Sequence, residues 1–153
     1  MNFLTERQQY VMVKGRKSKM FLLVSGVPQG SVLGPLLFLI FIGDISEGVT
    51  ADTLVYVDDS KVKDKVKTNE DVENLQENLD KIYTWEENNN MKFNGGKFLV
   101  IRYGKDKNLK ENTIYFTSEM KETIMQVENC RDLGITMQDN VTFSLQVEQV
   151  CKK

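Results

Sequence analysis

The chain contains no histidine among its 153 residues and has two cysteines, Cys130 and Cys151. Without histidine, serine–histidine and cysteine–histidine nucleophilic catalysis are excluded. So few cysteines, with no histidine beside them, argue against a zinc site and against a disulfide framework, and we expect both thiols to be free. Any catalytic chemistry must therefore rely on carboxylates, lysines or metal ions.

Long hydrophobic runs are also absent. The most apolar stretch, residues 32–42, is interrupted by Gly34 and Pro35 and closed by Gly43 and Asp44. A membrane-spanning helix needs about 20 apolar residues, so this stretch is too short. The first residues lack the basic start and apolar core of a secretory signal. We therefore expect an intracellular protein that does not enter a membrane.

Charge of one sign is not in excess, because the formal net charge is −2 with 27% charged and 41% hydrophobic residues. This composition is typical of one globular unit and argues against a strong, autonomous nucleic-acid binder. Four lysines nevertheless alternate along one segment, and in a strand they would share one face. They could line a nucleic-acid track or be solvated edge-strand lysines, and both interpretations stay open. These lysines are Lys61, Lys63, Lys65 and Lys67.

Two adjacent carboxylates, Asp58 and Asp59, follow the apolar, β-prone run at residues 53–57. Mg²⁺ prefers oxygen ligands and retains waters for a phosphate-bearing substrate, so a carboxylate pair at a strand tip is a candidate metal site. In two-metal phosphoryl transfer, such carboxylates fix where the ions sit. The alternative is a solvated Asp-Asp turn, because aspartate is common in turns.

A glycine- and proline-rich segment lies upstream at residues 25–31. Gly26, Pro28 and Gly30 leave little room for regular structure there, so we expect a loop from which Gln29 projects. Its amide could contact a base, a sugar or a template backbone. Alternatively, the loop simply caps the following helix, with Ser31 as N-cap and Pro35 in the first turn. The apolar residues after Pro35 predict a buried helix.

The segment at residues 25–42 resembles the motif that precedes the catalytic aspartates of reverse transcriptases, most nearly those of non-LTR retrotransposons. The resemblance continues, in the same order, through Tyr56-Val57-Asp58-Asp59, through Trp85 and Asn94 to Lys97, and to residues 130–135. Several motifs in the family's order are far more specific than any one of them, and together they cover most of the chain.

This resemblance implies a polymerase site that acts on an RNA template, a DNA primer and a deoxynucleoside triphosphate with Mg²⁺ or Mn²⁺. Asp58 would bind both metal ions and Asp59 would assist. The residues implied to contact template or incoming nucleotide are Pro28, Gln29 and Gly30. Tyr56 and Val57 would brace the floor under the primer end, and the turn at Leu133 and Gly134 would act as a primer grip. Lys97 would lie near the departing pyrophosphate, although an exposed lysine there is more often only solvated.

The pattern of elements predicts an α+β fold, and the resemblance implies a partial reverse-transcriptase palm in which an antiparallel sheet packs on two helices. Helices are expected over residues 31–44 and from a capping box at residues 68–71 to the asparagines at 88–90. Tyr83 and Trp85 are expected to pack in the core or at its rim. Two hairpins are expected, at residues 9–24 around a turn at 15–18, and at residues 54–66 with the aspartates near its tip. Further strands are expected at residues 98–103, 113–116, 123–127 and 133–137, with a polar loop at 105–112.

A departure from the family shapes the functional expectation. These polymerases take another metal-binding aspartate from a strand upstream of the Gln29 loop, but Glu6 is the only acid before Ser25. Asp52 is expected in the loop after the first helix and would not replace it. We therefore expect residues 1–153 to be a partial palm domain that lacks the fingers, that aspartate strand and a full thumb, and to be inactive alone. The alternatives are a nucleic-acid-binding remnant and an interaction module that associates through uncovered apolar palm surface.

Overall fold

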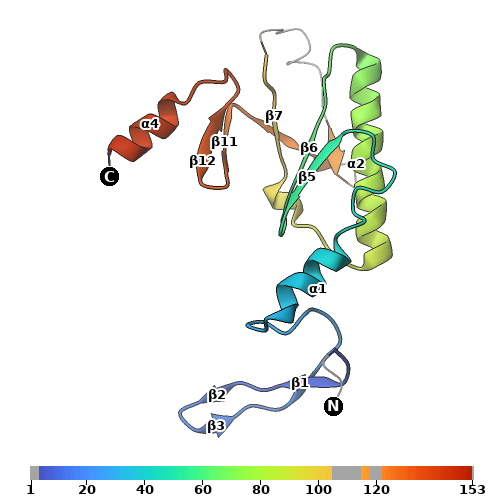
Figure 1. Ribbon diagram of the computed structural model, residues 1–153, viewed down its shortest axis with the longest axis vertical. Coiled ribbons are helices and arrows are strands. Elements are labelled where there is room, and N and C mark those ends of the chain that lie inside the picture. Colours follow the sequence, from blue (N-terminus) through green and yellow to red (C-terminus); the bar gives the residue numbers. More distant parts are fainter. Residues whose placement is uncertain (1–3, 105–114, 118–121, 153) are drawn as a thin grey trace. The chain divides into compact units, whose positions relative to one another are not determined.

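A computed structural model describes residues 4–104, 115–117 and 122–152 (Figure 1). It has mixed helical and strand structure and divides into two compact units. The first unit comprises Met1–Ile45 and Tyr56–Asp59, and the second comprises Ser46–Val55 and Ser60–Lys153. The helices and strands are α1 (Leu33–Phe41), α2 (Asn69–Asn89), α4 (Ser144–Cys151), the 3-10 helix η1 (Gly95–Lys97), β1 (Arg7–Gln9), β2 (Met12–Val13), β3 (Arg16–Lys17), β4 (Phe21–Leu23), β5 (Asp52–Tyr56), β6 (Asp59–Lys63), β7 (Leu99–Ile101), β8 (Phe116–Thr117), β9 (Glu122–Thr123), β10 (Met125–Val127), β11 (Asn129–Asp132) and β12 (Ile135–Gln138).

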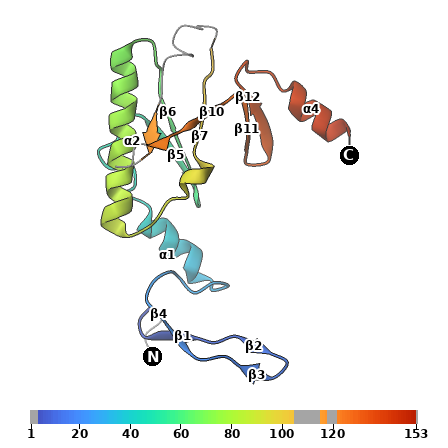
Figure 2. The same ribbon diagram turned by 180° about the vertical axis from the view of Figure 1, so that it is seen from behind.

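The first unit begins with a long hairpin that is visible from both sides in Figures 1 and 2. Its outer part pairs β2 with β3, and its inner part pairs β1 with β4, both antiparallel. The tip is Lys14-Gly15, where φ is 47° and 77°, because a two-residue turn with two positive φ values matches the twist of the strands. The predicted hairpin is confirmed, but the turn predicted at residues 15–18 is wrong. Left-handed backbone at Lys14 moves the turn one residue earlier.

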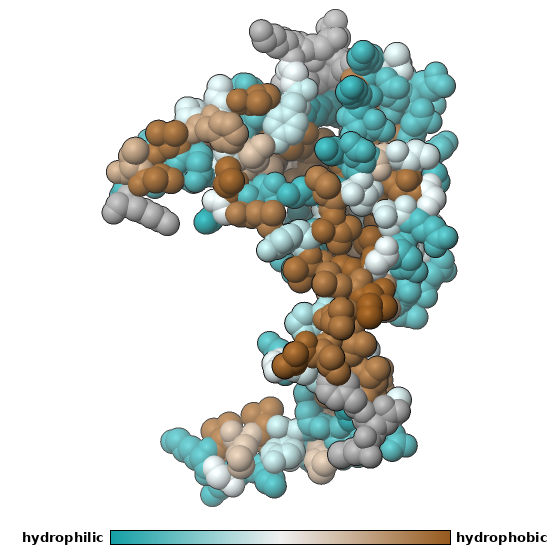
Figure 3. Space-filling model, viewed as in Figure 1, coloured by the Kyte–Doolittle hydropathy of each residue, from teal (hydrophilic) through white to brown (hydrophobic). Residues whose placement is uncertain are grey.

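Helix α1 follows the hairpin and is much more exposed than the sequence predicts. Leu36 is 54% exposed and Ile40 is 68% exposed, while Ile42 and Ile45 just beyond the helix are buried. Figure 3 shows hydrophobic side chains gathered over α1. The prediction of a buried helix is therefore wrong for this chain. An apolar sequence shows only that a helix favours burial, and the described residues do not cover this one.

Helix α2 organises the second unit, and its start agrees with the predicted capping box. The Thr68 hydroxyl accepts a hydrogen bond from the Asp71 amide, and the Asp71 carboxylate accepts from the amides of Lys67 and Thr68. These backbone amides lower the pKa of the Asp71 carboxyl group. The helix ends at Asn89, and the left-handed backbone of the C-cap residue Asn90 (φ 49°) stops the helical pattern.

Aromatic side chains form a compact cluster at the C-terminal end of α2. The Tyr83 ring meets Phe93 and Phe98 edge-on, with ring centroids 6.3 and 5.8 Å apart, and Trp85 stacks on Phe93 at 6.4 Å. Burial raises the pKa of Tyr83 to about 12, with smaller contributions from nearby carboxylates. The prediction that Tyr83 and Trp85 are packing residues is confirmed, because both are buried.

The described strands form six two-stranded sheets rather than one continuous antiparallel sheet. Beyond the first hairpin these are β5–β6, β8–β9, β11–β12 and the pair of β7 with β10, which is parallel. The mixed α and β content is confirmed. Of the strand expected at residues 113–116, only Tyr115 and Phe116 are described, and the polar loop expected at 105–112 lies outside the described residues. None of the helices in the described ranges has the length and apolar character to span a bilayer.

The sequence analysis missed α4, which packs on β12. Gln138 accepts hydrogen bonds from the Ser144 hydroxyl and the Leu145 amide at the start of this helix. Gln146 accepts from the Thr136 amide, and Gln149 accepts from the Thr136 hydroxyl, both at 2.8 Å. The residue at the N-cap position, Phe143, makes no side-chain capping bond. The sequence therefore lacks the N-cap residue that usually marks the start of a helix. Hydrogen bonds to Gln138 on the neighbouring strand take the place of that cap.

Asn78 joins α2 to the segment that leads into β5. It is 2% exposed, its carbonyl oxygen accepts from the Thr50 amide (2.8 Å) and hydroxyl (3.2 Å), and its amide donates to the Asn74 carbonyl. We expect Asn78→Ala to lower the free energy of unfolding by about 1–3 kcal/mol, because it leaves buried polar groups without partners. Chemical denaturation measures this change. Asn74→Ala keeps the backbone carbonyl at an exposed position, and an equal loss in that control would contradict the expectation.

Candidate active site

The aspartate pair lies at the tip of the β5–β6 hairpin. Strand β5 ends at Tyr56, Val57 and Asp58 form the turn, and β6 starts at Asp59. Val57 has φ 57°, a left-handed conformation that is rare for a β-branched residue and costs about 1–3 kcal/mol. The four side chains from Tyr56 to Asp59 are exposed. The predicted hairpin is confirmed, and its strained turn presents both carboxylates at the surface.

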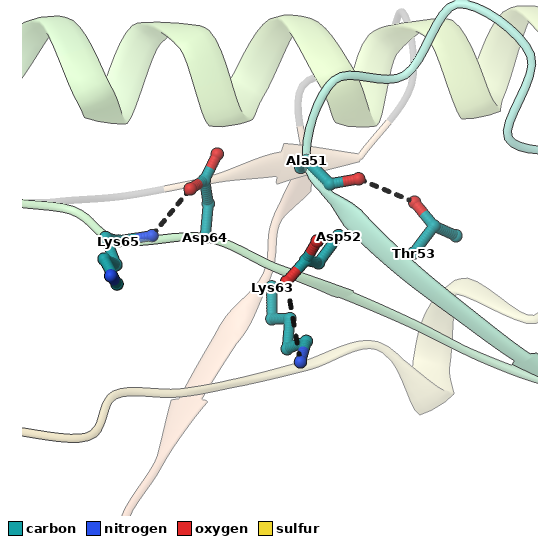
Figure 4. Close-up of polar contacts among 6 residues, drawn as sticks. All are labelled: Ala51, Asp52, Thr53, Lys63, Asp64 and Lys65. Carbon is teal, nitrogen blue, oxygen red and sulfur yellow. Dashed lines mark hydrogen bonds and ion pairs between the residues drawn. The ribbon is translucent and has the colours of Figure 1, made fainter.

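A further carboxylate, Asp52, lies at the opposite end of the same hairpin, and Figure 4 shows its surroundings. Asp52 is the first residue of β5, so the expectation of a loop position is wrong. Its Oδ2 atom lies 3.6 Å from Lys63 Nζ on β6, and both side chains are largely exposed. Pairing with the neighbouring strand extends β5 to this residue. Asp52 is separated from the turn by the length of the strand.

The loop at residues 25–31 is fixed by contacts from both of its flanks. The Arg7 guanidinium on β1 donates hydrogen bonds to the carbonyl oxygens of Ser25 and Gly26. At the other end, the Ser31 hydroxyl donates to the Pro28 carbonyl (2.7 Å) and accepts from the Gly34 amide (2.9 Å). The formal N-cap of α1 is Val32, so the predicted N-cap is displaced by one residue, but the Ser31 hydroxyl still binds a first-turn amide.

Gly34 allows the start of α1 to approach this loop. A Cβ atom at this position would lie 2.8 Å from Ser31 Oγ and 3.0 Å from the Pro28 carbonyl oxygen. Both distances are shorter than carbon–oxygen van der Waals contact, so only glycine fits without a shift. Gly30 has φ 79° next to the exposed Gln29, which also favours glycine. The loop that carries Pro28, Gln29 and Gly30 is therefore held in one shape by the residues around it.

The predicted site residues are divided between the two units. Pro28, Gln29 and Gly30 belong to the first unit, which also contains the turn Tyr56–Asp59. Lys97 belongs to the second unit, where it is exposed and is the last residue of η1. The sequence analysis did not single out Arg7 or Gly34. Arg7 acts on carbonyls 18 and 19 residues away, which no local pattern reveals, whereas the position of Gly34 in the first helical turn was a usable signal.

The aspartate pair offers few protein ligands for a divalent metal ion. Among the described residues, no group of three or more histidine, cysteine, aspartate or glutamate side chains is placed to hold a metal ion. Asp58 and Asp59 are adjacent, exposed oxygen donors, which suits a hard ion that keeps several waters. The donor set fits partial coordination of Mg²⁺ or Mn²⁺ and leaves further ligands to water or substrate.

Comparison with known proteins identifies the class. A family model described as "Reverse transcriptase (RNA-dependent DNA polymerase)" matches residues 2–137. The chain therefore belongs to the reverse transcriptase family.

A curated relative gives a more particular similarity. The chain is 32% identical over 158 aligned residues to "RNA-directed DNA polymerase from mobile element jockey" of Drosophila melanogaster. That alignment covers 97% of this chain and 17% of the relative, so the chain spans about a sixth of the relative's length. No solved structure matches the chain significantly. The resemblance to the reverse transcriptases of non-LTR retrotransposons is confirmed.

Proposed function

We propose that residues 1–153 form part of the palm of an RNA-directed DNA polymerase, in which the Asp58–Asp59 turn is the catalytic centre. The observation that carries this proposal is a pair of exposed carboxylates on a strained hairpin turn, in the same compact unit as the Gln29 loop. Structural strain at an exposed turn is common where side-chain placement serves chemistry. Membership of the reverse transcriptase family supports the same assignment.

The reaction joins a nucleotide to a primer on an RNA template. The primer 3′ hydroxyl oxygen attacks the α-phosphorus of the deoxynucleoside triphosphate, its proton is lost, and the bond to the β-phosphate breaks to release pyrophosphate. Divalent ions at the site would polarise the phosphate and neutralise the charge that develops on it. Asp58 and Asp59 would hold the ions. By the family resemblance, Lys97 would offset charge on the departing pyrophosphate.

The remaining site residues have binding roles in this proposal. Gln29 would donate and accept hydrogen bonds with the template or the incoming nucleotide, and Pro28 and Gly30 would fix its orientation. Tyr56 and Val57 would support the primer end beside the aspartates. The shape of the loop and of the turn matters because reacting atoms must be placed within a few tenths of an ångström.

We propose that these residues do not suffice for catalysis by themselves. Two adjacent carboxylates leave most positions around two ions unfilled, and the only acid before Ser25 is Glu6. A further aspartate strand and fingers supplied by a longer polymerase would complete the site. The proposal is tested by comparing how the chain alone and a fused enzyme extend a DNA primer on an RNA template. The fused enzyme carries the upstream fingers-and-palm segment of a related reverse transcriptase ahead of Met1.

Weak metal binding follows from the two-carboxylate donor set. We expect the chain to bind Mg²⁺ with a dissociation constant on the order of 1 mM, and Mn²⁺ somewhat more tightly, because water supplies most ligands. Titration with Mn²⁺ followed by water-proton relaxation measures this affinity, and Asp58→Asn should weaken it. Micromolar binding would show that a third protein ligand exists.

Self-association is a further expectation for the isolated chain. The apolar side chains exposed on α1 include Leu36, Leu39 and Ile40, and contiguous apolar surface of this kind favours association. We propose that the chain is oligomeric when a longer polymerase does not cover this helix. Light scattering at micromolar concentration tests the proposal, and a monodisperse monomer would contradict it.

A further inference from the structure

A partly buried ion pair joins β6 to β11 within the second unit. Lys61 Nζ on β6 lies 2.5 Å from Asp132 Oδ1 and 2.6 Å from Asp132 Oδ2 on β11. The two residues are 71 positions apart in sequence, so the contact depends on the tertiary fold. Their side chains are only 38% and 30% exposed. Partial burial reduces screening by solvent and salt, so this contact can constrain geometry better than an open surface pair.

The neighbouring lysine provides a direct comparison. Lys63 lies two residues further along β6 and therefore on the same strand face. It pairs with Asp52 at 3.6 Å, and the two side chains are 62% and 79% exposed. Exposed pairs of this length contribute between about 0 and 1 kcal/mol to stability. Two of the four alternating lysines thus already contact carboxylates, which argues against a free track of four lysines along this strand.

Both partners of the shorter pair lie next to predicted site elements. Lys61 is two residues after Asp59 in β6. Asp132 is the last residue of β11, and it pairs with Ile135 across the turn Leu133-Gly134. That turn has φ values of 45° and 89°, which is typical of a tight two-residue turn, and it follows Asp132 directly in the chain. Any constraint on Asp132 is therefore also a constraint on this turn.

We propose that Lys61 and Asp132 form a tether that fixes the Leu133–Gly134 turn to the Ser60–Lys63 part of β6, so that the turn that would hold the primer and this segment of the second unit keep one spacing. The role in primer placement rests on the proposed polymerase function. Lys61 and Asp132 are positioning residues in this scheme, because neither is assigned a contact with the reacting atoms. The ion pair itself exists independently of that function, so the two can be tested separately.

The pKa of the Cys130 thiol can report on the tether without a polymerase assay. It lies two residues before Asp132 on the same strand and is partly buried. Burial raises the pKa of its thiol, the Asp132 carboxylate raises it further, and Lys61 lowers it. Tyr103 also belongs to this cluster, because burial raises the pKa of its hydroxyl and Cys130 and Asp132 raise it further.

The first experiment measures alkylation of Cys130 by iodoacetamide as a function of pH, in the full chain with Cys151→Ser to leave one thiol. Lys61→Met should raise the apparent pKa of Cys130, because an unpaired carboxylate then faces the thiol, and Asp132→Asn should lower it. Lys63→Met is the matched control and should leave it unchanged. Equal profiles for Lys61→Met and Lys63→Met would overturn the tether.

The second experiment measures primer extension by the fused enzyme. Lys61→Met and Asp132→Asn should each raise KM for the primer–template by roughly 10-fold, with a smaller change in kcat, because the chemistry groups are intact. The exchange Lys61→Asp with Asp132→Lys should restore much of the loss. A shift of the thiol pKa without any change in KM would overturn the positioning role. If the parent fused enzyme does not extend primers, the polymerase proposal fails, while the alkylation profiles still decide the tether.

Discussion

Extension of a DNA primer on an RNA template is expected to be undetectable with the 153-residue chain alone and to appear in the fused enzyme. The chain contributes Asp58 and Asp59 on their strained turn, and we propose that a longer polymerase supplies the remaining carboxylate ligand. A missing ligand removes the charge stabilisation that dominates phosphoryl transfer. It also leaves the reacting atoms poorly positioned, and a misplacement of about 1 Å already lowers the rate by about 100-fold. Template-dependent incorporation by the chain alone would contradict the partial-palm proposal.

Asp58→Asn should abolish activity in the fused enzyme, with a loss of at least about 1,000-fold in kcat. The amide has nearly the same shape as the carboxylate, so the turn should fold unchanged while the charge that we propose holds the metal ions is lost. Single-turnover primer extension measures the loss. A residual rate within 10-fold of the parent enzyme would show that Asp58 is not a metal ligand.

Asp52→Asn is the matched control for that substitution. Asp52 is an aspartate on the same hairpin, but it lies at the opposite end of β5 and its contact is the 3.6 Å pair with Lys63. That pair is exposed, so its loss should change stability by no more than about 1 kcal/mol. We expect activity close to that of the parent enzyme. An equal loss in both variants would point to general damage to the hairpin rather than to loss of a ligand.

Local features of the fold were predictable because local chemistry determines them. The capping box at Thr68 and Asp71 is read from four consecutive residues, and the structure forms both of its hydrogen bonds. The aspartate hairpin likewise follows from an apolar β-prone run that ends in two turn-forming residues. Strand ends were less predictable. Asp52 joins β5 because a neighbouring strand pairs with it, which composition does not reveal.

Features that depend on distant residues were missed or misjudged. Arg7 binds the carbonyls of Ser25 and Gly26, and Lys61 binds Asp132, and each contact joins segments that only the fold brings together. The apolar residues of α1 predicted burial, yet the described chain leaves much of this helix exposed. A hydrophobic sequence indicates that a helix favours burial, but it does not reveal which surface would cover that helix.

Gly34→Ala is expected to produce the second large loss of activity, although Gly34 has no chemical group to offer a substrate. The new methyl group would meet Ser31 Oγ at 2.8 Å and the Pro28 carbonyl oxygen at 3.0 Å. Ser31 could rotate away only by giving up its bonds to the Pro28 carbonyl and the Gly34 amide. The backbone at Pro28 must therefore shift, and the adjacent Gln29 shifts with it. Because we propose that this loop positions a substrate, a displacement of about 1 Å there should lower kcat/KM for nucleotide addition by about 100-fold.

Two further variants separate this steric cause from other effects. Gly95→Ala introduces the same methyl group where no atom lies within 4 Å of it and where φ is not positive, so activity should be retained. Ser31→Ala in the Gly34→Ala background removes the closer of the two clashes, so the double variant should recover part of the loss even though two hydrogen bonds are gone. Such recovery is non-additive, as expected for residues in direct contact. Losses that simply add would show that Gly34 acts through backbone flexibility, and the loop would then not be held by close packing.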